Sequence, residues 1–378
     1  MMKKSNIISL YPSAGKMLER SEGCYLFDMS GRQFVDFESG VWCVNLGHSN
    51  GRIVKVIERQ SKKSIHHGYK FRNHDSETLA KQLNNIIGYE NGDSVFLSSG
   101  SEAVNLAITI AMHITGRKKI LKIDNTYLSA FGYGQISPEN DRLATVRFDD
   151  LNSVDNIAFD DIAAFVVETG GASIDVVKFP DNAFVEKLID LSQKSGVLII
   201  AEEVTTGMGR TGRWFGFQHY GFSPDMVVTG KALGNGYPVS AVTISEKIAA
   251  LLDNNPFRYA QSHQNDPLGC AVGLEVIKAI KEDGLIERSS AIGVYFKEQL
   301  DGLKYRHPSK IEEVRGRGVM LALEFSEQVD GEAINNGLFE AGFVVGFKLN
   351  TLRFLPPLII GIKDIDKLIG EIDKQLSV

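Results

Sequence analysis

The sequence predicts an α/β protein in which a mostly parallel β-sheet is covered by helices on both faces and joined to a smaller α+β domain. Three observations predict this fold. Short runs rich in Val and Ile alternate with helical patterns through the middle of the chain, as in parallel strands linked by helices. The 378 residues are too many for one ordinary hydrophobic core and enough for two domains. Both ends of the chain carry separate strand patterns, which we assign to the smaller domain.

The large domain is predicted from six apolar runs and the segments between them. Residues 183–196 have apolar side chains at helical spacing and separate two of the runs. Another helix is expected to start near Ser101. The six predicted strands are residues 94–99, 118–124, 161–168, 197–204, 225–230 and 239–245.

The small domain is predicted from both chain ends. Residues 24–37 have the pattern of a β-hairpin that turns at Ser30-Gly31. Helical segments are expected within 268–300, followed by strands at 315–325 and around Arg353. We expect the hairpin to pack with the C-terminal region. The predicted division is residues 1–47 for the N-terminal segment of the small domain, 48–255 for the large domain, and 256–378 for the C-terminal small domain with its linking helix.

Composition and charge argue against several classes of function. The formal net charge is -6, from 47 acidic and 41 basic residues, which gives no electrostatic reason for a nucleic acid or an anionic membrane as partner. The three scattered cysteines do not form a disulfide framework, which favours a reducing compartment. The apolar stretch before Tyr11 is too short for a signal peptide, and no run approaches a membrane span. We therefore expect a cytoplasmic protein.

Polar residues follow the predicted strands, where ligands bind in open α/β sheets. Gly100-Ser101 follows the first strand and opens a helix. Glu168, Glu202 and Lys231 come at the ends of three later strands. Because the carboxyl ends of parallel strands meet at one edge, these side chains are expected to converge there.

This combination matches the needs of pyridoxal phosphate. A helix that starts at Gly100-Ser101 offers free N–H groups to a phosphate. Burial would lower the pKa of Lys231, so that its amine can react with an aldehyde. Glu202 is the candidate to keep the pyridine nitrogen protonated. Each feature alone has an ordinary explanation: a helix cap, a solvated lysine or, for Glu168, a structural ion pair. Their ordered combination favours the cofactor.

Several long motifs resemble those of the class III, or omega, aminotransferases, which are fold-type-I pyridoxal-phosphate enzymes. The acetylornithine and ornithine branch is the most similar, although this chain is divergent. The resemblance implies a seven-stranded type of sheet in the large domain and an obligate homodimer with shared active sites. The motifs that carry the resemblance lie at 23–40, 45–48, 98–104, 202–212, 227–242, 312–325 and 352–358.

The resemblance implies a role for each matched residue around the cofactor. Lys231 is similar to the lysine that carries the cofactor as a Schiff base and moves a proton between Cα and C4′. Gly100 and Ser101 resemble the phosphate cup. Tyr127 corresponds to the residue that stacks on one face of the ring, and Val204 to the aliphatic residue on the other face.

Three further matches concern the substrate and the second subunit. Ser262 resembles the Thr that reaches the phosphate from the neighbouring subunit. Arg353 is similar to an arginine that grips a substrate carboxylate, for which a guanidinium fork is well suited. Trp42 lies where members often place an aromatic residue of the substrate pocket, although a core Trp is an alternative.

The sequence departs from the family pattern at four places. Glu202 stands where the family has Asp, so the partner of the pyridine nitrogen is one methylene longer. Thr205 replaces the usual Gln that bonds the phenolic oxygen of the cofactor. Leu128 removes the histidine of a Tyr-His-Gly motif, and Thr169 replaces the proline after Glu168. These changes do not indicate one substrate.

The predicted function is a ping-pong transamination. An amine or amino acid donor displaces Lys231 from the cofactor, the freed lysine moves the Cα proton to C4′, and an oxo acid accepts the amino group. The carboxylate-binding interpretation of Arg353 favours 2-oxoglutarate or a pyruvate-class acceptor. Two alternatives remain open: an epimerase or racemase, aminomutase or decarboxylase on the same fold, and a cofactor-binding regulatory protein without turnover.

Overall fold

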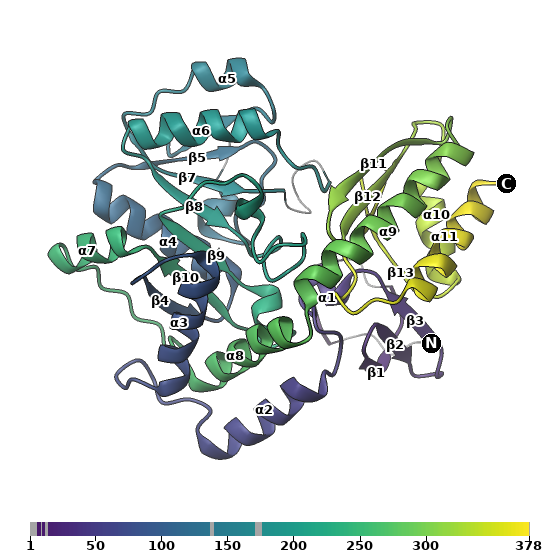
Figure 1. Ribbon diagram of the computed structural model, residues 1–378, viewed down its shortest axis with the longest axis horizontal. Helices are drawn as coiled ribbons and strands as arrows, with labels where there is room; N and C mark the ends of the chain where they lie inside the picture. The colour runs from purple at the N-terminus through teal and green to yellow at the C-terminus, as the bar shows by residue number, and fades with distance from the viewer. Residues whose placement is uncertain (1–5, 9, 12–13, 137–139, 171–175, 378) are drawn as a thin grey trace.

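The computed structural model describes residues 6–8, 10–11, 14–136, 140–170 and 176–377. Two lobes are visible in Figure 1, a large one that contains the central sheet and a smaller one that contains both the start and the end of the chain. Within the described residues, none of the helices is long and apolar enough to cross a membrane.

A seven-stranded sheet forms the centre of the large lobe. Six strands run in one direction, and β10 alone is antiparallel to its neighbours β4 and β9. The predicted mostly parallel sheet is therefore confirmed. In spatial order the strands are β4 (Asp93–Leu97), β10 (Ser240–Ile244), β9 (Met226–Thr229), β8 (Leu198–Glu202), β7 (Ile162–Glu168), β5 (Lys119–Ile123) and β6 (Leu143–Val146).

Helices cover both faces of this sheet (Figure 1). Val166, Ile200 and Val228 face α4 in one buried cluster, whereas Phe165 and Ile199 pack on the opposite face against α6. This alternation buries the strands on both sides, as their continuous apolar sequences predict. The helices of the large lobe are α2 (Gly51–Lys63), α3 (His74–Ile87), α4 (Gly100–Thr115), α5 (Leu151–Asp155), α6 (Asn182–Lys194), α7 (Glu246–Asn254) and α8 (Pro267–Glu282), with short 3₁₀ turns η1 (Gly132–Gln135), η2 (Gly216–His219) and η3 (Lys231–Gly234). The next helix, α9 (Leu285–Arg306), packs on β11, β12 and α11 of the small lobe.

Besides α9, the described part of the small lobe contains two four-stranded sheets and two helices. Strands from both chain ends meet in the first sheet, where Val35 of β3 pairs in parallel with Phe343 of β13. The predicted hairpin at 24–37 is present as β2 and β3. The first sheet contains β1 (Leu18–Glu22), β2 (Tyr25–Asp28), β3 (Gln33–Asp36) and β13 (Phe343–Val344); the second contains β11 (Ile311–Arg317), β12 (Met320–Phe325), β15 (Thr351–Phe354) and β14 (Gly346–Lys348); the helices are α10 (Gly331–Glu340) and α11 (Ile362–Leu376).

A left-handed turn, α1 (Ser39–Trp42), connects the first small sheet to the large lobe. Its φ angles are 43° at Ser39, 57° at Val41 and 69° at Trp42, a region that is costly for residues other than glycine. Buried polar groups hold this turn. Asp36 accepts the N–H of Gly40 at 2.8 Å, and the buried Arg210 donates to the Ser39 hydroxyl at 2.9 Å.

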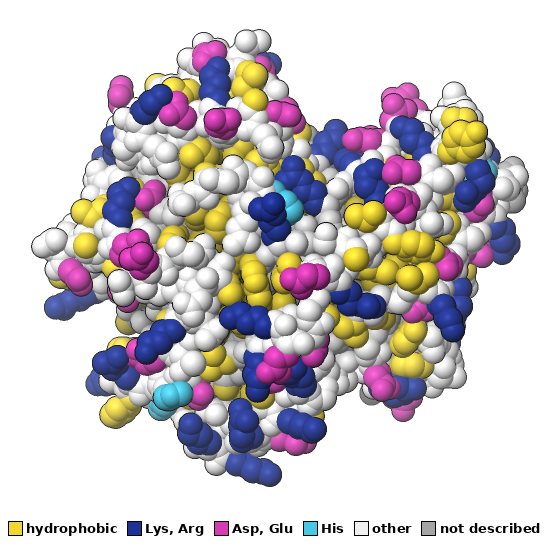
Figure 2. Space-filling model, in the orientation of Figure 1, with side chains coloured by type: hydrophobic (Ala, Val, Ile, Leu, Met, Phe, Trp, Pro, Cys, Tyr) yellow, Lys and Arg dark blue, Asp and Glu magenta, His cyan; other side chains and the backbone are white. Residues whose placement is uncertain are grey.

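Charged side chains are mixed over the surface. On the face drawn in Figure 2, basic and acidic side chains alternate, and hydrophobic side chains gather between the two lobes. This distribution agrees with the small net charge of the sequence.

Candidate active site

A cavity of about 340 Å³ lies beyond the carboxyl ends of the parallel strands. Other cavities in the described chain have similar volumes, 230–320 Å³, so chemistry rather than size distinguishes this one. It combines a lysine, two carboxylates, two hydroxyl groups and an aromatic pair. Its lining consists of Val41, Trp42, Gly100, Ser101, Tyr127, Leu128, Glu168, Glu202, Val204, Thr205 and Lys231.

Lys231 enters the cavity immediately after β9. Its backbone has φ 41°, in the left-handed region, and Gly230 precedes it in an extended conformation. The ammonium group donates a hydrogen bond to Thr205 Oγ1 at 2.9 Å. Burial lowers the pKa of Lys231, while the nearby carboxyl of Glu202 opposes this shift. The lysine is therefore closer to its neutral, nucleophilic form than a surface lysine would be.

The two consecutive glutamates after β8 have different environments. Glu203 points away from the cavity and accepts hydrogen bonds from Thr206 Oγ1 at 2.6 Å and from the Gly216 and Phe217 amides at 2.8 Å. Glu202 lines the cavity and accepts one hydrogen bond, from the Val204 amide at 3.0 Å. Burial raises the pKa of Glu202 to about 7. Of these two glutamates, only Glu202 is therefore placed to contact a group bound in the cavity.

Glu168 lies beside Glu202 at the end of β7, in register with it. Its buried Oε2 has no hydrogen-bond partner among the described residues. Burial raises the pKa of Glu168 well above its usual range, and the neighbouring Glu202 adds to the shift. An unpartnered buried carboxylate oxygen is costly, which indicates a place that a ligand fills.

The N-terminus of α4 closes one end of the cavity. Ser99 and Glu102 form a capping box there, which satisfies the N–H groups of these two residues. The N–H groups of Gly100 and Ser101, at the first two positions of the helix, have no acceptor within the helix itself. A Cβ added to Gly100 would lie 2.9 Å from both methyl groups of Val204, so only glycine allows this packing. The hydroxyl of Ser101 accepts the amide of Ala130 at 2.9 Å and keeps its own proton for another acceptor.

Aromatic groups form the open side of the cavity. The Trp42 ring is half-buried and lies 4.7 Å from Lys231 Nζ, which is a cation–π distance. Tyr127 is half-exposed. Trp42 is therefore a cavity residue and not a fully buried core residue.

Known proteins resemble this chain along nearly all its length. The sequence pattern of the family described as aminotransferase class-III matches residues 11–134 and 126–376. The acetylornithine aminotransferase of Archaeoglobus fulgidus is 30% identical, with 97% of each chain covered. The LysW-aminoadipate semialdehyde/glutamate semialdehyde transaminase of Sulfurisphaera tokodaii is also 30% identical, over 95% of this chain and 94% of the relative. The solved acetylornithine aminotransferase of Elizabethkingia anophelis is 27% identical, with a TM-score of 0.86 over 98% of this chain and 96% of that one.

The chain belongs to the class-III aminotransferases. Members of this family are fold-type-I pyridoxal-phosphate enzymes, so the predicted fold class and enzyme class are confirmed. The relatives transfer amino groups, and amino-group transfer is therefore the activity of this chain, whereas the epimerase, aminomutase or decarboxylase alternative is not favoured.

The cavity of this aminotransferase fits pyridoxal phosphate. The α4 N-terminus offers N–H groups for a phosphate, and the orphaned oxygen of Glu168 lacks a donor. A lysine with a lowered pKa lies beside both carboxylates. These features come from different strands and all face the same space. The individual roles of the residues remain predictions.

Two residues expected at the site lie outside the cavity lining. Arg353 is on β15, with its guanidinium carbon 5.2 Å from the Trp42 ring and Nη2 3.7 Å from Glu38 Oε1. Ser262 is exposed in the connection before α8. The predicted role of Ser262 concerns a second subunit, which a single chain does not test.

Two lining residues were not expected from the sequence. Val41 faces the cavity because of the left-handed turn, for which a β-branched residue gives no signal. Leu128 takes its place beside Tyr127. Its position directly after Tyr127 in the family motif could have indicated that Leu128 lines the cavity.

Proposed function

We propose that this aminotransferase binds pyridoxal phosphate covalently through Lys231 and moves an amino group from an amine donor to an oxo acid by a ping-pong mechanism. The observation that carries the proposal is the buried Lys231 amine, which lies in one cavity with Glu202, Glu168 and the N-terminus of α4. When bound, the cofactor supplies an aldehyde for the amine and a ring that accepts electrons from the substrate Cα.

Lys231 is the proposed proton carrier. In its neutral form it removes a proton from Cα of the donor and returns it at C4′. The lowered pKa supports this role, because a permanently charged ammonium group cannot accept a proton. The Thr205 hydroxyl holds the lysine side chain at 2.9 Å, which orients the amine before it reacts.

Glu202 is the proposed partner of the pyridine nitrogen. Its carboxylate would hold a proton at that nitrogen and so keep the ring electron-poor. Among the described residues, one hydrogen bond restrains this side chain, which supports the idea that the longer glutamate adjusts to the ring. The orphaned oxygen of Glu168 supports a second contact with the cofactor.

The remaining proposed contacts are with the phosphate of the cofactor and with the two faces of its ring. The N–H groups at Gly100 and Ser101 would bind the phosphate. Tyr127 and Val204 would enclose the ring, which orients it and excludes water. Their positions in the cavity lining support both assignments.

Arg353 is the proposed carboxylate-binding residue, with 2-oxoglutarate or a pyruvate-class oxo acid as acceptor. Its guanidinium and the cavity lysine both lie within cation–π distance of the Trp42 ring. A bidentate pair with a substrate carboxylate suits this group. Glu38 faces Arg353 at 3.7 Å and would give way to the substrate.

A homodimer with shared active sites is the proposed assembly. Ser262 is exposed and would contact the phosphate bound by the other subunit. Ile65, Tyr69 and Phe71 are also exposed, at 53%, 52% and 69%, on the connection between α2 and α3. Several exposed large apolar side chains on one connection support a subunit interface there. The three free thiols, at Cys24, Cys43 and Cys270, support a cytoplasmic location.

Covalent trapping tests the proposal. Reduction of the cofactor-loaded protein with borohydride, followed by peptide mapping, is expected to place the tag on Lys231. The Lys231→Ala variant should carry no tag, whereas Lys118→Ala, which changes an exposed lysine, should be labelled normally. A tag on another residue, or none, would refute the assignment.

A single half-reaction tests the transfer itself. Amino acids, diamines and N-acetylornithine are offered one at a time without an acceptor. A true donor should convert the bound cofactor to pyridoxamine phosphate, identified by chromatography after denaturation. Addition of 2-oxoglutarate or pyruvate should then restore the original form. Release of CO₂ or loss of chirality, without the aminated cofactor, would contradict a transaminase.

A further inference from the structure

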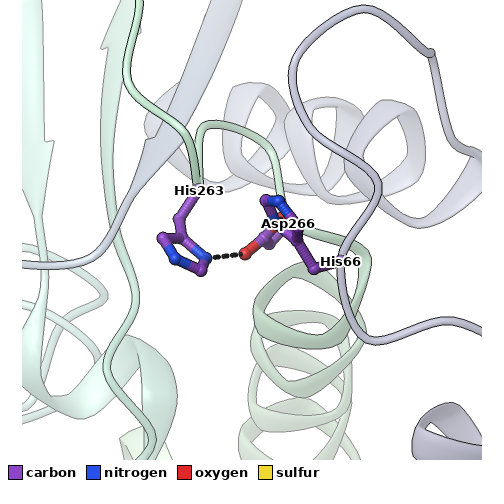
Figure 3. Close-up of side chains that lie close together, drawn as sticks. All are labelled: His66, His263 and Asp266. Carbon is purple, nitrogen blue, oxygen red and sulfur yellow. Dashed lines mark hydrogen bonds and ion pairs between the residues drawn. The ribbon is translucent and has the colours of Figure 1, made fainter.

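Two histidines and an aspartate that are not part of the active-site cavity lining lie close together. His66 lies between α2 and α3, whereas His263 and Asp266 lie directly before α8 (Figure 3). The Nδ1 atoms of His66 and His263 lie 2.6 Å from the two different oxygens of Asp266. The three ligand-type atoms lie within 4.8 Å of one another.

The side chain of Asp266 does not cap the helix that it precedes. Asp266 is the N-cap residue of α8, a position at which the side chain normally accepts an N–H of the first helical turn. Here the side chain makes no capping hydrogen bond, and both of its oxygens face imidazole nitrogens. The helix thus loses the usual cap while the three side chains converge on one point.

Hydrogen bonds outside the cluster hold its two segments together. Asn265 exchanges hydrogen bonds with the backbone of Phe96 on β4, each 2.9 Å long. Asn73, the N-cap of α3, donates to the carbonyl of Asn265 at 2.9 Å. The backbone next to Asp266 is therefore fixed without help from the histidines, so the cluster is largely preorganised.

We propose that His66, His263 and Asp266 bind a divalent transition metal ion, with zinc as the best match. Two imidazoles and one carboxylate suit zinc, whereas calcium and magnesium prefer oxygen ligands alone. Three protein ligands leave the fourth tetrahedral position to water. The side chains of His66 and His263 are 39% and 59% exposed in the single chain.

The ligand atoms must move apart slightly to receive the ion. In a tetrahedral zinc site with bonds of about 2.0 Å, neighbouring ligand atoms are about 3.3 Å apart. The present nitrogen–oxygen separations of 2.6 Å must therefore widen, which the exposed histidine side chains allow. Each imidazole must also carry its proton on Nε2, because the metal replaces the proton on Nδ1.

The bound ion would cross-link two segments that are far apart in the sequence. It would fix the connection between α2 and α3 to the start of α8, where the rest of the contact is made by hydrogen bonds. The cluster shares no residue with the lining of the active-site cavity of its own chain.

Zinc titration of the cofactor-loaded protein, freed of unbound pyridoxal phosphate, tests the proposal. Calorimetry is expected to show one zinc ion per chain, and zinc should raise the melting temperature by a few degrees. Cobalt in place of zinc should give visible absorption bands of a nitrogen- and oxygen-ligated ion. No saturable binding at one ion per chain would overturn the proposal.

Matched variants locate the site. His66→Ala and Asp266→Asn should each weaken zinc binding at least about tenfold and abolish the thermal shift. His67→Ala removes the neighbouring histidine, which contacts Gly68 and not the cluster, and should bind zinc like the unchanged protein. Circular dichroism of each variant separates loss of the site from loss of the fold. Unchanged zinc affinity in both cluster variants would also overturn the proposal.

Discussion

At the residue scale, burial links the charge states of Lys231, Glu202 and Glu168. Each side chain is buried, and burial opposes its charged form. The lysine and Glu202 also stabilise one another's charge, so neither titrates as an isolated group. These buried charges are electrostatically costly, and a bound cofactor with its own charges would relieve that cost.

The raised pKa of Glu202 predicts how the stability of the cofactor-free protein changes with pH. The pKa of Glu202 is about 7 in the folded chain, against an ordinary value of 4.5. Between these values the folded state binds more protons than the unfolded state, so stability falls as pH rises through this window. Glu202→Gln should remove this loss. Its free energy of unfolding should exceed that of the unchanged protein by a margin that grows as pH rises from 4.5 to about 7.

Urea unfolding of the cofactor-free proteins at a series of pH values measures this margin. Glu298→Gln changes an exposed glutamate and serves as control, for which the difference should stay near zero at every pH. A Glu202→Gln margin that does not depend on pH would contradict the assigned burial of charge.

Arg353 gives a prediction about substrate binding. Arg353→Ala should raise the KM for the oxo acid about ten- to a hundredfold, because a charge-assisted bidentate pair is lost. The absorption band of the cofactor should not change, since Arg353 is outside the cavity lining. The double variant Glu38→Gln, Arg353→Ala controls for a buried carboxylate left without its partner. Unchanged oxo-acid kinetics would remove Arg353 from the substrate site.

At the element scale, the N-terminus of α4 and the turn α1 define the shape of the cavity. α4 brings unpaired N–H groups to one end. The turn α1 places Trp42 at the open side through φ angles that Val41 and Trp42 rarely adopt. The surrounding hydrogen bonds to Ser39 and Gly40 stabilise that conformation.

The packing at the start of α4 can be tested by replacing Gly100 with alanine, which adds one methyl group. Gly100→Ala should weaken pyridoxal-phosphate binding about tenfold or more, because the new Cβ would lie 2.9 Å from both Val204 methyl groups and displace them into the cavity. Absorbance titration with the cofactor measures the effect. Gly51→Ala is the matched control, since Gly51 is the first residue of α2 and has open space around its Cβ position. Equal cofactor affinity in the two variants would contradict the predicted packing.

Sequence analysis predicted six of the seven strands of the large sheet because each is a buried run rich in branched apolar residues. It missed β6, whose four residues include the exposed Thr145 and resemble a loop. The order of the strands was beyond one sequence, because pairing depends on contacts between distant segments. The residues at the strand ends could be predicted, since parallel strands bring their carboxyl ends together.

Other parts of the site had no local signal. The left-handed turn at Ser39–Trp42 depends on Asp36 and Arg210, the second of which is 171 residues from Ser39. Local propensity even argues against this turn, because Val41 is β-branched. The metal-binding proposal likewise depends on His66 and Asp266, which meet only in the folded chain.

At the scale of the whole molecule, the cavity draws on both lobes. The strand ends and α4 belong to the large lobe (Figure 1). Trp42 follows the first sheet of the small lobe, and its ring lies 5.2 Å from the guanidinium carbon of Arg353 in the second sheet. A buried core that includes residues of both lobes, among them Phe37 and Phe215, joins them. The domain boundaries predicted near residues 47 and 255 remain predictions.

The proposed dimer leads to a test in which two inactive variants restore activity together. Lys231→Ala lacks the reactive amine. Ser262→Asp places a negative charge where Ser262 is proposed to meet the phosphate of the other subunit. If Ser262 acts across the interface, a mixed dimer contains one site with an intact Lys231 from one chain and an intact Ser262 from the other. After random exchange of subunits, about one quarter of the unchanged activity should return.

Subunits are exchanged by mild denaturation and refolding of equal amounts of the two variants. Activity and bound cofactor are then compared with each variant treated alone. If Ser262 acted only within its own chain, each mixed site would lack one of the two groups and no activity would return. Sedimentation of the unchanged protein as a monomer would rule out the shared site directly. The exposed Ser262 and the apolar side chains of Ile65, Tyr69 and Phe71 favour the first outcome, because a lone chain leaves all four in water.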